Sequence, residues 1–275
     1  MDSDAFTLND GRRMPRFGFG VWQISPAETA AAAAAAFDAG FRLIDTAAGY
    51  GNEAEVGQAV KAGTVPREAV FVTTKLANQN HGFDEALQAF DKSLGRLGLN
   101  EIDLYLIHWP CPGRDRYVET WRALARLREE GRVRSIGVSN FAIEHLQRLF
   151  DEVGIVPTVN QVELHPRFQQ RALREFHAEH GVVTQSWSPL GRGRLNDEAV
   201  VAALARKHGC SWAQVVLRWH LQLGVSVITR SVSPAHIREN YASRDLALDE
   251  DDMARMTRLD RPDGRFGADP NRMAA

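Results

Sequence analysis

The sequence predicts a (βα)8 TIM barrel, an α/β fold, formed by one domain that spans residues 1–275. Eight short apolar runs of strand length alternate along the chain with longer segments of helical periodicity. No Pro- or Ser-rich linker interrupts this alternation. The length of 275 residues also suits a closed parallel barrel, which typically takes about 250 residues. An open doubly wound sheet, which divides into two halves at a switch point, fits eight such units less well.

The predicted strands and helices follow one another in order along the chain. The strands are expected at residues 17–21, 41–44, 70–73, 104–107, 133–138, 158–159, 182–184 and 225–228. The helices are expected near residues 26–39, 53–62, 84–95, 117–130, 143–150, 169–179, 196–207 with 211–222, and 234–241. The first helix contains seven consecutive alanines, but Pro26 and Glu28 near its start and Gly40 after its end are ordinary helix boundaries.

The two ends of the chain lie outside this alternation. Residues 1–14 contain an Asp10-Gly11 turn between short flanks, which predicts a β-hairpin that closes the floor of the barrel. Residues 249–275 are polar, and we expect them to form a short C-terminal tail.

Composition and charge exclude several classes of function. Lys and Arg number 33 and Asp and Glu number 35, a net charge of −2, so the basic surface of a nucleic-acid-binding protein is missing. The longest apolar run, residues 30–37, is far shorter than the ~20 residues that span a bilayer. The acidic N-terminus lacks the features of a signal peptide, which predicts a cytoplasmic protein without nucleic-acid or membrane partners.

No metal site is predicted. Cys111 and Cys210 stand far apart, with neither metal-ligand nor disulfide-framework spacing. His177 and His180 have a spacing that two ligands on a helix could have, but no carboxylate or cysteine completes the set. A solvated helix face is the preferred interpretation of this histidine pair.

Polar side chains follow the predicted strands, where barrel enzymes place their active sites. Asp45 and Tyr50 follow the second strand, Lys75 the third and His108 the fourth. An unperturbed Tyr phenol has a pKa of about 10, and a nearby Lys ammonium lowers it, while an Asp keeps the Lys charged. The His could orient a carbonyl oxygen toward the phenol. Together these four residues predict proton transfer to a carbonyl or from an alcohol.

Each of the four residues also has another interpretation when taken singly. Asp45 could cap the next helix, and Lys75 or His108 could be a hydrogen-bonded structural group. Lys75 could alternatively form a Schiff base, as the lysine of a barrel aldolase does. Four compatible residues at three neighbouring strand ends favour the proton-transfer site.

Five stretches, taken in order, resemble one known family. They are GFRLIDTAAGYGNE at residues 40–53, FVTTK at 71–75, DLYLIHWP at 103–110, GVSNF at 137–141 and SPLGRG at 188–193. In these motifs the chain is similar to the aldo-keto reductases, and within them to the prokaryotic diketogluconate-reductase-like members. The resemblance implies a (βα)8 barrel that reduces aldehydes or ketones with NADPH. It also implies that Tyr50 is the proton donor, with Lys75, Asp45 and His108 as its partners.

The resemblance further implies how the cofactor binds. A Rossmann site is not expected, because Gly18-Phe19-Gly20 continues into Val21-Trp22-Gln23 and fails the Gly-x-Gly-x-x-Gly pattern. Ser139, Asn140 and Gln161 would hold the carboxamide, Trp187 would stack on the nicotinamide where a tyrosine is usual, and residues 188–191 would follow the pyrophosphate. The full implied set is Gly20, Val21, Ser139, Asn140, Gln161, Trp187, Ser188, Leu190, Gly191, Arg230, Ser231, Val232, Ser233, His236, Glu239 and Asn240.

Two substitutions bear on the choice between NADPH and NADH. In the segment that resembles the family's 2′-phosphate site, Arg230 replaces the usual lysine and His236 the usual arginine. Arg230 can grip a phosphate bidentately, whereas His236 is mostly neutral near pH 7. We therefore expect a preference for NADPH with NADH also accepted.

The carbonyl substrate is expected to contact Tyr50, His108, Trp22 and Trp109, together with the loop at residues 78–83. The short polar tail predicts an open pocket for small or polar carbonyl compounds. A monomer is expected. Since some members of the family are regulatory subunits, a noncatalytic cofactor-sensing protein is a further alternative, although the complete four-residue set favours an enzyme.

Overall fold

Eight parallel strands close into a barrel in the computed structural model, which describes residues 4–63 and 65–273. The barrel strands are β3 (Phe17–Gly20), β4 (Leu43–Asp45), β5 (Phe71–Leu76), β6 (Ile102–Ile107), β7 (Val133–Ser139), β8 (Val159–Glu163), β9 (Val183–Trp187) and β10 (Ser226–Thr229). They pair in chain order, and β10 pairs with β3 to complete the ring. The predicted (βα)8 fold is confirmed, with each predicted strand in its place.

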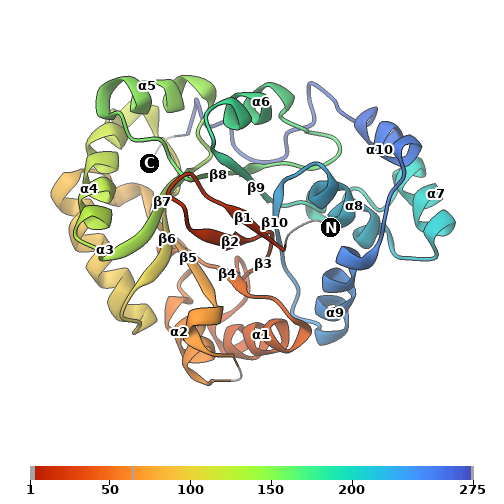
Figure 1. Cartoon of the computed structure of the whole chain (residues 1–275), viewed down its shortest axis with the longest axis horizontal. Helices are drawn as coiled ribbons and strands as arrows, with labels where there is room; N and C mark the ends of the chain where they lie inside the picture. Colours follow the sequence, from red (N-terminus) through yellow and green to blue (C-terminus); the bar gives the residue numbers. More distant parts are fainter. Residues whose placement is uncertain (1–3, 64, 274–275) are drawn as a thin grey trace.

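The helices form a ring outside the strands (Figure 1). They are α1 (Pro26–Ala39), α2 (Glu53–Lys61), α3 (Phe83–Leu97), α4 (Tyr117–Glu129), α5 (Ile143–Val153), α6 (Arg171–Glu179), α7 (Ala199–His208), α8 (Trp212–Gln222), α9 (Pro234–Ala242) and α10 (Glu250–Thr257). Helix α1 begins at Pro26 and ends at Ala39, and the Gly40 that caps it has a φ of 111°, which favours a residue without a Cβ. The alanine run is therefore a helix, as predicted.

The interior of the barrel is filled from its own strands and from a hairpin below them. Strands β1 (Ala5–Thr7) and β2 (Arg13–Pro15) form this antiparallel hairpin, which lies across the end of the barrel that faces the viewer in Figure 1. The hairpin side chains Leu8 and Met14 are buried in one cluster with inward-facing strand residues such as Leu104 and Ile228. This burial of apolar area closes the floor, as the sequence predicted, and leaves the other end of the barrel as the mouth.

The C-terminal segment differs from the prediction. Residues 249–275 were expected to be tail throughout, but residues 250–257 form α10, which packs on α7. The side chain of Asp249 accepts a hydrogen bond from the main-chain N–H of Asp252 at 2.9 Å and caps the helix. The expectation overlooked this capping pattern, since the segment is rich in charge and its apolar positions are few. The remaining residues after α10 run back over the barrel mouth toward β8.

Candidate active site

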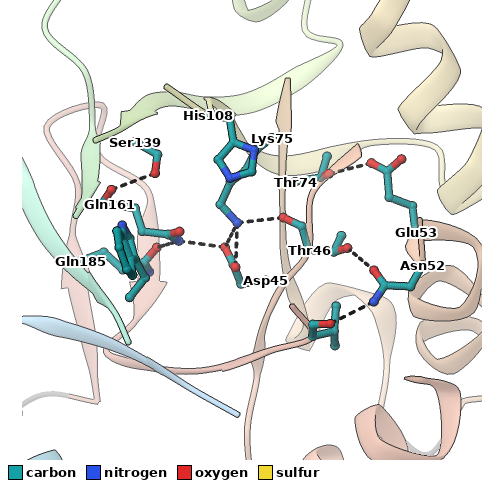
Figure 2. A network of polar contacts seen from close by, with 12 residues as sticks. Asp45, Thr46, Asn52, Glu53, Thr74, Lys75, His108, Ser139, Gln161 and Gln185 are labelled. Carbon is teal, nitrogen blue, oxygen red and sulfur yellow. Dashed lines mark hydrogen bonds and ion pairs between the residues drawn. The ribbon is translucent and has the colours of Figure 1, made fainter. Parts of the chain in front are cut away.

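A buried ion pair lies at the centre of the barrel mouth (Figure 2). Lys75 leaves the end of β5 and donates from Nζ to both carboxylate oxygens of Asp45, at 2.8 and 2.7 Å, and to the main-chain oxygen of Thr46 at 2.9 Å. Burial disfavours the charged lysine, but the Asp45 carboxylate and the Tyr50 phenol outweigh it and raise the pKa of Lys75 above its ordinary value. Lys75 is therefore a fixed ammonium, and Asp45 is its counter-ion rather than a helix cap.

Tyr50 stands next to this pair. It ends a single 3₁₀ turn at Ala48–Tyr50, and the Nζ of Lys75 lies 5.1 Å from the centroid of its ring. Burial raises the pKa of Tyr50 above its ordinary value of 10.0, and the opposing effect of Lys75 offsets this only in part. The lowered pKa expected from the sequence is therefore not what the structure gives. A phenol that keeps its proton at neutral pH is suited to act as a general acid.

His108 completes the group of four predicted residues. Its ring lies edge-on to Tyr50, with 5.7 Å between ring centroids and 73° between planes, and Figure 2 shows it beside Lys75. Burial, with a smaller contribution from the Lys75 ammonium, lowers the pKa of His108 to about 3. A neutral imidazole retains one N–H that it can donate to an oxygen in the mouth. The structure thus brings together all four residues predicted from three strand ends.

Two buried residues that the sequence analysis did not single out hold the turn that carries Tyr50. Asn52 accepts from Thr46 Oγ1 at 2.8 Å and donates to the main-chain oxygen of Val21 at 2.9 Å. Glu53 accepts from Thr74 Oγ1 and from Arg96 Nε, both at 2.6 Å. Both follow Tyr50 closely in the sequence, at the N-terminal end of α2, and this position was the available signal.

The residues predicted to hold a carboxamide adjoin the ion pair. Gln161 donates from Nε2 to Asp45 Oδ1 at 2.8 Å and to Gln185 Oε1 at 2.7 Å, while no described residue hydrogen-bonds to its Oε1. Ser139 donates to the main-chain oxygen of Gln161 at 2.8 Å. Asn140 is held in a left-handed conformation, with φ of 64°, and donates to the main-chain oxygen of His108 at 2.9 Å. These contacts fix the orientation of the three side chains.

Trp187 ends β9 next to this group. Its indole Nε1 donates to Asn140 Oδ1 at 2.8 Å, so the ring has one fixed edge. The loop that follows is sharply bent, with φ of 50° at Ser188, 57° at Gly191 and 56° at Arg192. Leu190 is half-buried at the start of the 3₁₀ turn Gly191–Gly193. The structure thus gives the predicted stacking residue and pyrophosphate loop defined positions at the mouth.

The predicted phosphate segment lies between β10 and α9. Arg230, Val232 and His236 are exposed, and Ser233 caps α9 by accepting from the main-chain N–H of His236 at 3.5 Å. Arg230 has no ion-pair partner among the described residues. The remaining members differ in exposure: Ser231 and Glu239 are half-buried, and Asn240 is buried and donates to Thr229 Oγ1 at 3.2 Å.

Gly20 and Val21 have internal contacts in the structure, and their part in holding a cofactor stays a prediction. A Cβ at Gly20 would lie 2.7 Å from Ile228 Cγ2, so this glycine is required by packing inside the barrel. The side chain of Val21 is buried in the core. Its main-chain N–H donates to the main-chain oxygen of Asp45, and its main-chain oxygen accepts from the main-chain N–H of Ile24 and from Asn52 Nδ2.

Two predicted substrate residues stand at the rim of the mouth. Trp22 is 39% exposed, and the Arg192 guanidinium lies 5.6 Å from the centroid of its ring. Trp109 directly follows His108 and is half-buried. These contacts place Trp22 against the loop after β9. The role of both tryptophans toward a substrate stays a prediction.

The expectation for the histidine pair on α6 was wrong. His177 is fully buried rather than solvated, and its ring nitrogens contact Thr184 Oγ1 at 2.8 Å and Asn160 Nδ2 at 3.0 Å. Asn160 in turn bonds both main-chain groups of Phe141, the residue after Asn140. Through Asn160, His177 thus stabilises the main chain that follows β7.

The described residues include no group of three or more His, Cys, Asp or Glu side chains placed to hold a metal ion.

Comparison with known proteins decides the family. The family model described as "Aldo/keto reductase family" matches residues 14–261. The chain belongs to the aldo/keto reductase family. It is therefore an oxidoreductase by family, and the resemblance read from the motifs is confirmed.

Within the described part of the chain, no helix combines the length and apolar character needed to cross a bilayer.

Three relatives illustrate how closely the chain follows this family. An "Aldo-keto reductase" of Mycobacterium sp. (strain JLS) is 50% identical over 270 residues, which cover 98% of both chains. "Methylglyoxal reductase DkgA" of Yersinia pestis is 50% identical over 265 residues, 96% of this chain and 95% of that protein. The crystal structure of a Gox0644 mutant in complex with NADPH has a TM-score of 0.95 and 48% identity, with 98% of both chains covered.

Proposed function

We propose that the protein reduces small aldehydes and ketones to alcohols with NADPH, and that Tyr50 is the general acid. The observation that carries the proposal is the buried Lys75–Asp45 ion pair beside a protonated Tyr50 and a neutral His108. The relatives named methylglyoxal reductase and the NADPH complex of Gox0644 support it. Small dicarbonyl compounds such as methylglyoxal are therefore the first substrates to test.

The residues around the mouth fit a nicotinamide dinucleotide. Gln161 Oε1 is left over as an acceptor for a carboxamide N–H, because the amide nitrogen of the same side chain is used internally. Trp187 offers an aromatic ring held at its edge by Asn140. Arg230 is exposed and has no ion-pair partner among the described side chains, so its guanidinium is available for a phosphate.

Each catalytic residue has one task in this proposal. Tyr50 gives the proton on its Oη to the carbonyl oxygen, and His108 donates a hydrogen bond to the same oxygen. The Lys75 ammonium stabilises the phenolate that forms on Tyr50, and Asp45 keeps Lys75 charged and in place. Bound NADPH supplies the hydride that reduces the carbonyl carbon.

The structure disfavours a Schiff-base aldolase. A lysine that attacks a carbonyl must be a neutral amine, which requires a lowered pKa. The pKa of Lys75 is raised instead, and its Nζ has three oxygen partners within 2.9 Å. Borohydride trapping with a carbonyl substrate is expected to leave Lys75 unmodified.

The experiment that tests the proposal is Tyr50→Phe. We expect kcat for carbonyl reduction, followed as loss of the absorbance of NADPH, to fall roughly 10²–10⁴-fold, because the proton donor is removed. NADPH affinity should stay unchanged. Tyr105→Phe is the matched control, since Tyr105 faces the helix layer and packs on Phe90, with 5.2 Å between ring centroids.

Retention of most of the wild-type kcat in Tyr50→Phe would refute the assignment of the general acid. Wild-type protein that binds NADPH but reduces no aldehyde, keto acid or keto sugar would instead favour the noncatalytic cofactor-sensing alternative.

A further inference from the structure

A carboxylate outside the catalytic group is buried at the mouth. Glu163 ends β8 and is only 1% exposed, a costly place for a charge without partners. Its Oε1 accepts from the main-chain N–H of Phe266 at 2.6 Å and contacts His165 Nε2 at 3.1 Å. Its Oε2 accepts from the main-chain N–H of Gly267 at 2.8 Å. Burial raises the pKa of Glu163, but these bonds outweigh it and lower the pKa below the ordinary 4.5.

Glu163 thereby ties the C-terminal segment to the mouth across more than 100 residues of sequence. The ring of Phe266 lies between His165 and the loop after β9. Its ring stacks on His165, with 4.6 Å between centroids and 17° between planes, and the Arg194 guanidinium lies 4.6 Å from the centroid of the same ring. A Cβ at Gly191 would lie 3.1 Å from the Phe266 ring, so this ring packs directly on the loop after β9.

The main chain of the same segment approaches Trp187 closely. A Cβ at Gly267 would lie 2.5 Å from Trp187 Cη2 and 2.7 Å from Glu163 Oε2. A Cβ at Gly264 would lie 1.7 Å from the main-chain oxygen of Arg167. Only glycine permits such contacts, so the main chain fits directly against Trp187 at Gly267 and against Arg167 at Gly264.

We propose that Glu163 is a positioning residue for the cofactor. By holding residues 264–267, it keeps Trp187 and the loop after β9 in the arrangement that binds the nicotinamide dinucleotide. The inference rests on the proposed function for the identity of that cofactor. Besides Glu163 and His165, Phe266 and Gly267 contact Trp187, Gly191 and Arg194. None of these residues belongs to the catalytic group, so the C-terminal segment acts on cofactor affinity.

Two variants and one control test the proposal. Glu163→Gln keeps the volume but leaves an amide that cannot accept both main-chain N–H bonds, and Gly267→Ala inserts a methyl group against Trp187. We expect the Kd for NADPH, titrated without any carbonyl compound, to rise about tenfold in each variant. In Glu163→Gln the reason is the loss of one bond to a charged group, and in Gly267→Ala it is the displacement of the Trp187 ring by the new methyl group. At saturating NADPH, kcat and the KM for the carbonyl should change less than about twofold.

Gly95→Ala in α3 is the matched control, because a Cβ there meets no atom within 4 Å, and its Kd for NADPH should equal that of the wild type. Thermal unfolding shows which variants fold. If Glu163→Gln does not fold, the Kd of Gly267→Ala for NADPH tests the inference. A folded variant with wild-type affinity for NADPH overturns the inference, as does a rise confined to the KM for the carbonyl. Since the titration needs no turnover, failure of the wild type to reduce carbonyl compounds refutes only the proposed function.

Discussion

Replacing Asp45 with asparagine removes the carboxylate that keeps Lys75 charged inside the barrel. Lys75 is fully buried and loses two bonds to charged oxygen, of 2.8 and 2.7 Å, while the main-chain oxygen of Thr46 stays at 2.9 Å. A buried ion left without its partner costs about 3–5 kcal/mol. Because the oxygen of Thr46 and the amide oxygen of the new asparagine can still accept from Nζ, we expect the lower end, a loss of about 3 kcal/mol in the free energy of unfolding at pH 7.

The pH dependence of this loss has a defined sign. In the wild type the pKa of Lys75 is raised, so its stabilising effect is complete at neutral pH and disappears only as pH rises through that raised pKa. In Asp45→Asn burial opposes the charge without the carboxylate and lowers the pKa of Lys75. The unfolded variant then binds the proton more tightly than the folded one, so its stability rises with pH. The difference in the free energy of unfolding between the wild type and the variant should therefore shrink from about pH 7 to pH 9, by at most about 1.4 kcal/mol per pH unit.

Urea denaturation of both proteins between about pH 6 and pH 9 measures this gap, and equal m-values show that the two-state comparison holds. Asp91→Asn is the matched control, because its ion pair with Arg132 leaves the Asp91 side chain 58% exposed. Its loss should stay within about 1 kcal/mol at every pH. A gap for Asp45→Asn that is below about 1 kcal/mol at pH 7, or that widens as pH rises, would refute the reasoning.

Three further predictions concern the site and the barrel. Burial lowers the pKa of His108 to about 3 and raises the pKa of Tyr50, so kcat/KM for reduction should not change through ionisation of either residue between about pH 5 and pH 8. An apparent pKa near 6.5 in this profile would contradict the assigned protonation states. Arg230→Ala should raise the KM for NADPH about tenfold while leaving the KM for NADH unchanged, and equal effects on both would exclude a 2′-phosphate contact. Gly18→Ala, whose new methyl group would lie 2.4 and 2.5 Å from two side chains inside the barrel, should lower the free energy of unfolding by about 1–3 kcal/mol, whereas Gly95→Ala should not lower it.

Most of the secondary structure could be predicted from local signals. The period of the apolar residues located all eight barrel strands, and capping residues set the bounds of α1, which begins at Pro26 and ends at Ala39 as expected. Helix α10 was overlooked because its signal is a capping box at Asp249 and Asp252 rather than an apolar stripe. Its stability depends on packing against α7, which no local pattern reports.

The site was predictable in its members but not in its electrostatics. Asp45, Lys75 and His108 were found because parallel strands in a barrel end at one mouth, so residues after neighbouring strands must converge. The direction in which the pKa of Tyr50 is shifted was not predictable, since it depends on burial outweighing the effect of the Lys75 charge. The roles of His177 and Glu163 were equally hidden, because their partners lie on other strands or near the C-terminus.

The sequence by itself therefore determined the barrel, the family and the four catalytic candidates, because periodicity and motif order are written along the chain. Only the tertiary structure decided which groups are charged and what holds them. Desolvation and hydrogen bonding depend on distances between segments such as β8 and residues 264–267, which meet only after the barrel closes. For this protein the chemistry of the mouth follows from that closure: Lys75 stays charged, His108 stays neutral, and the C-terminal segment is held by Glu163.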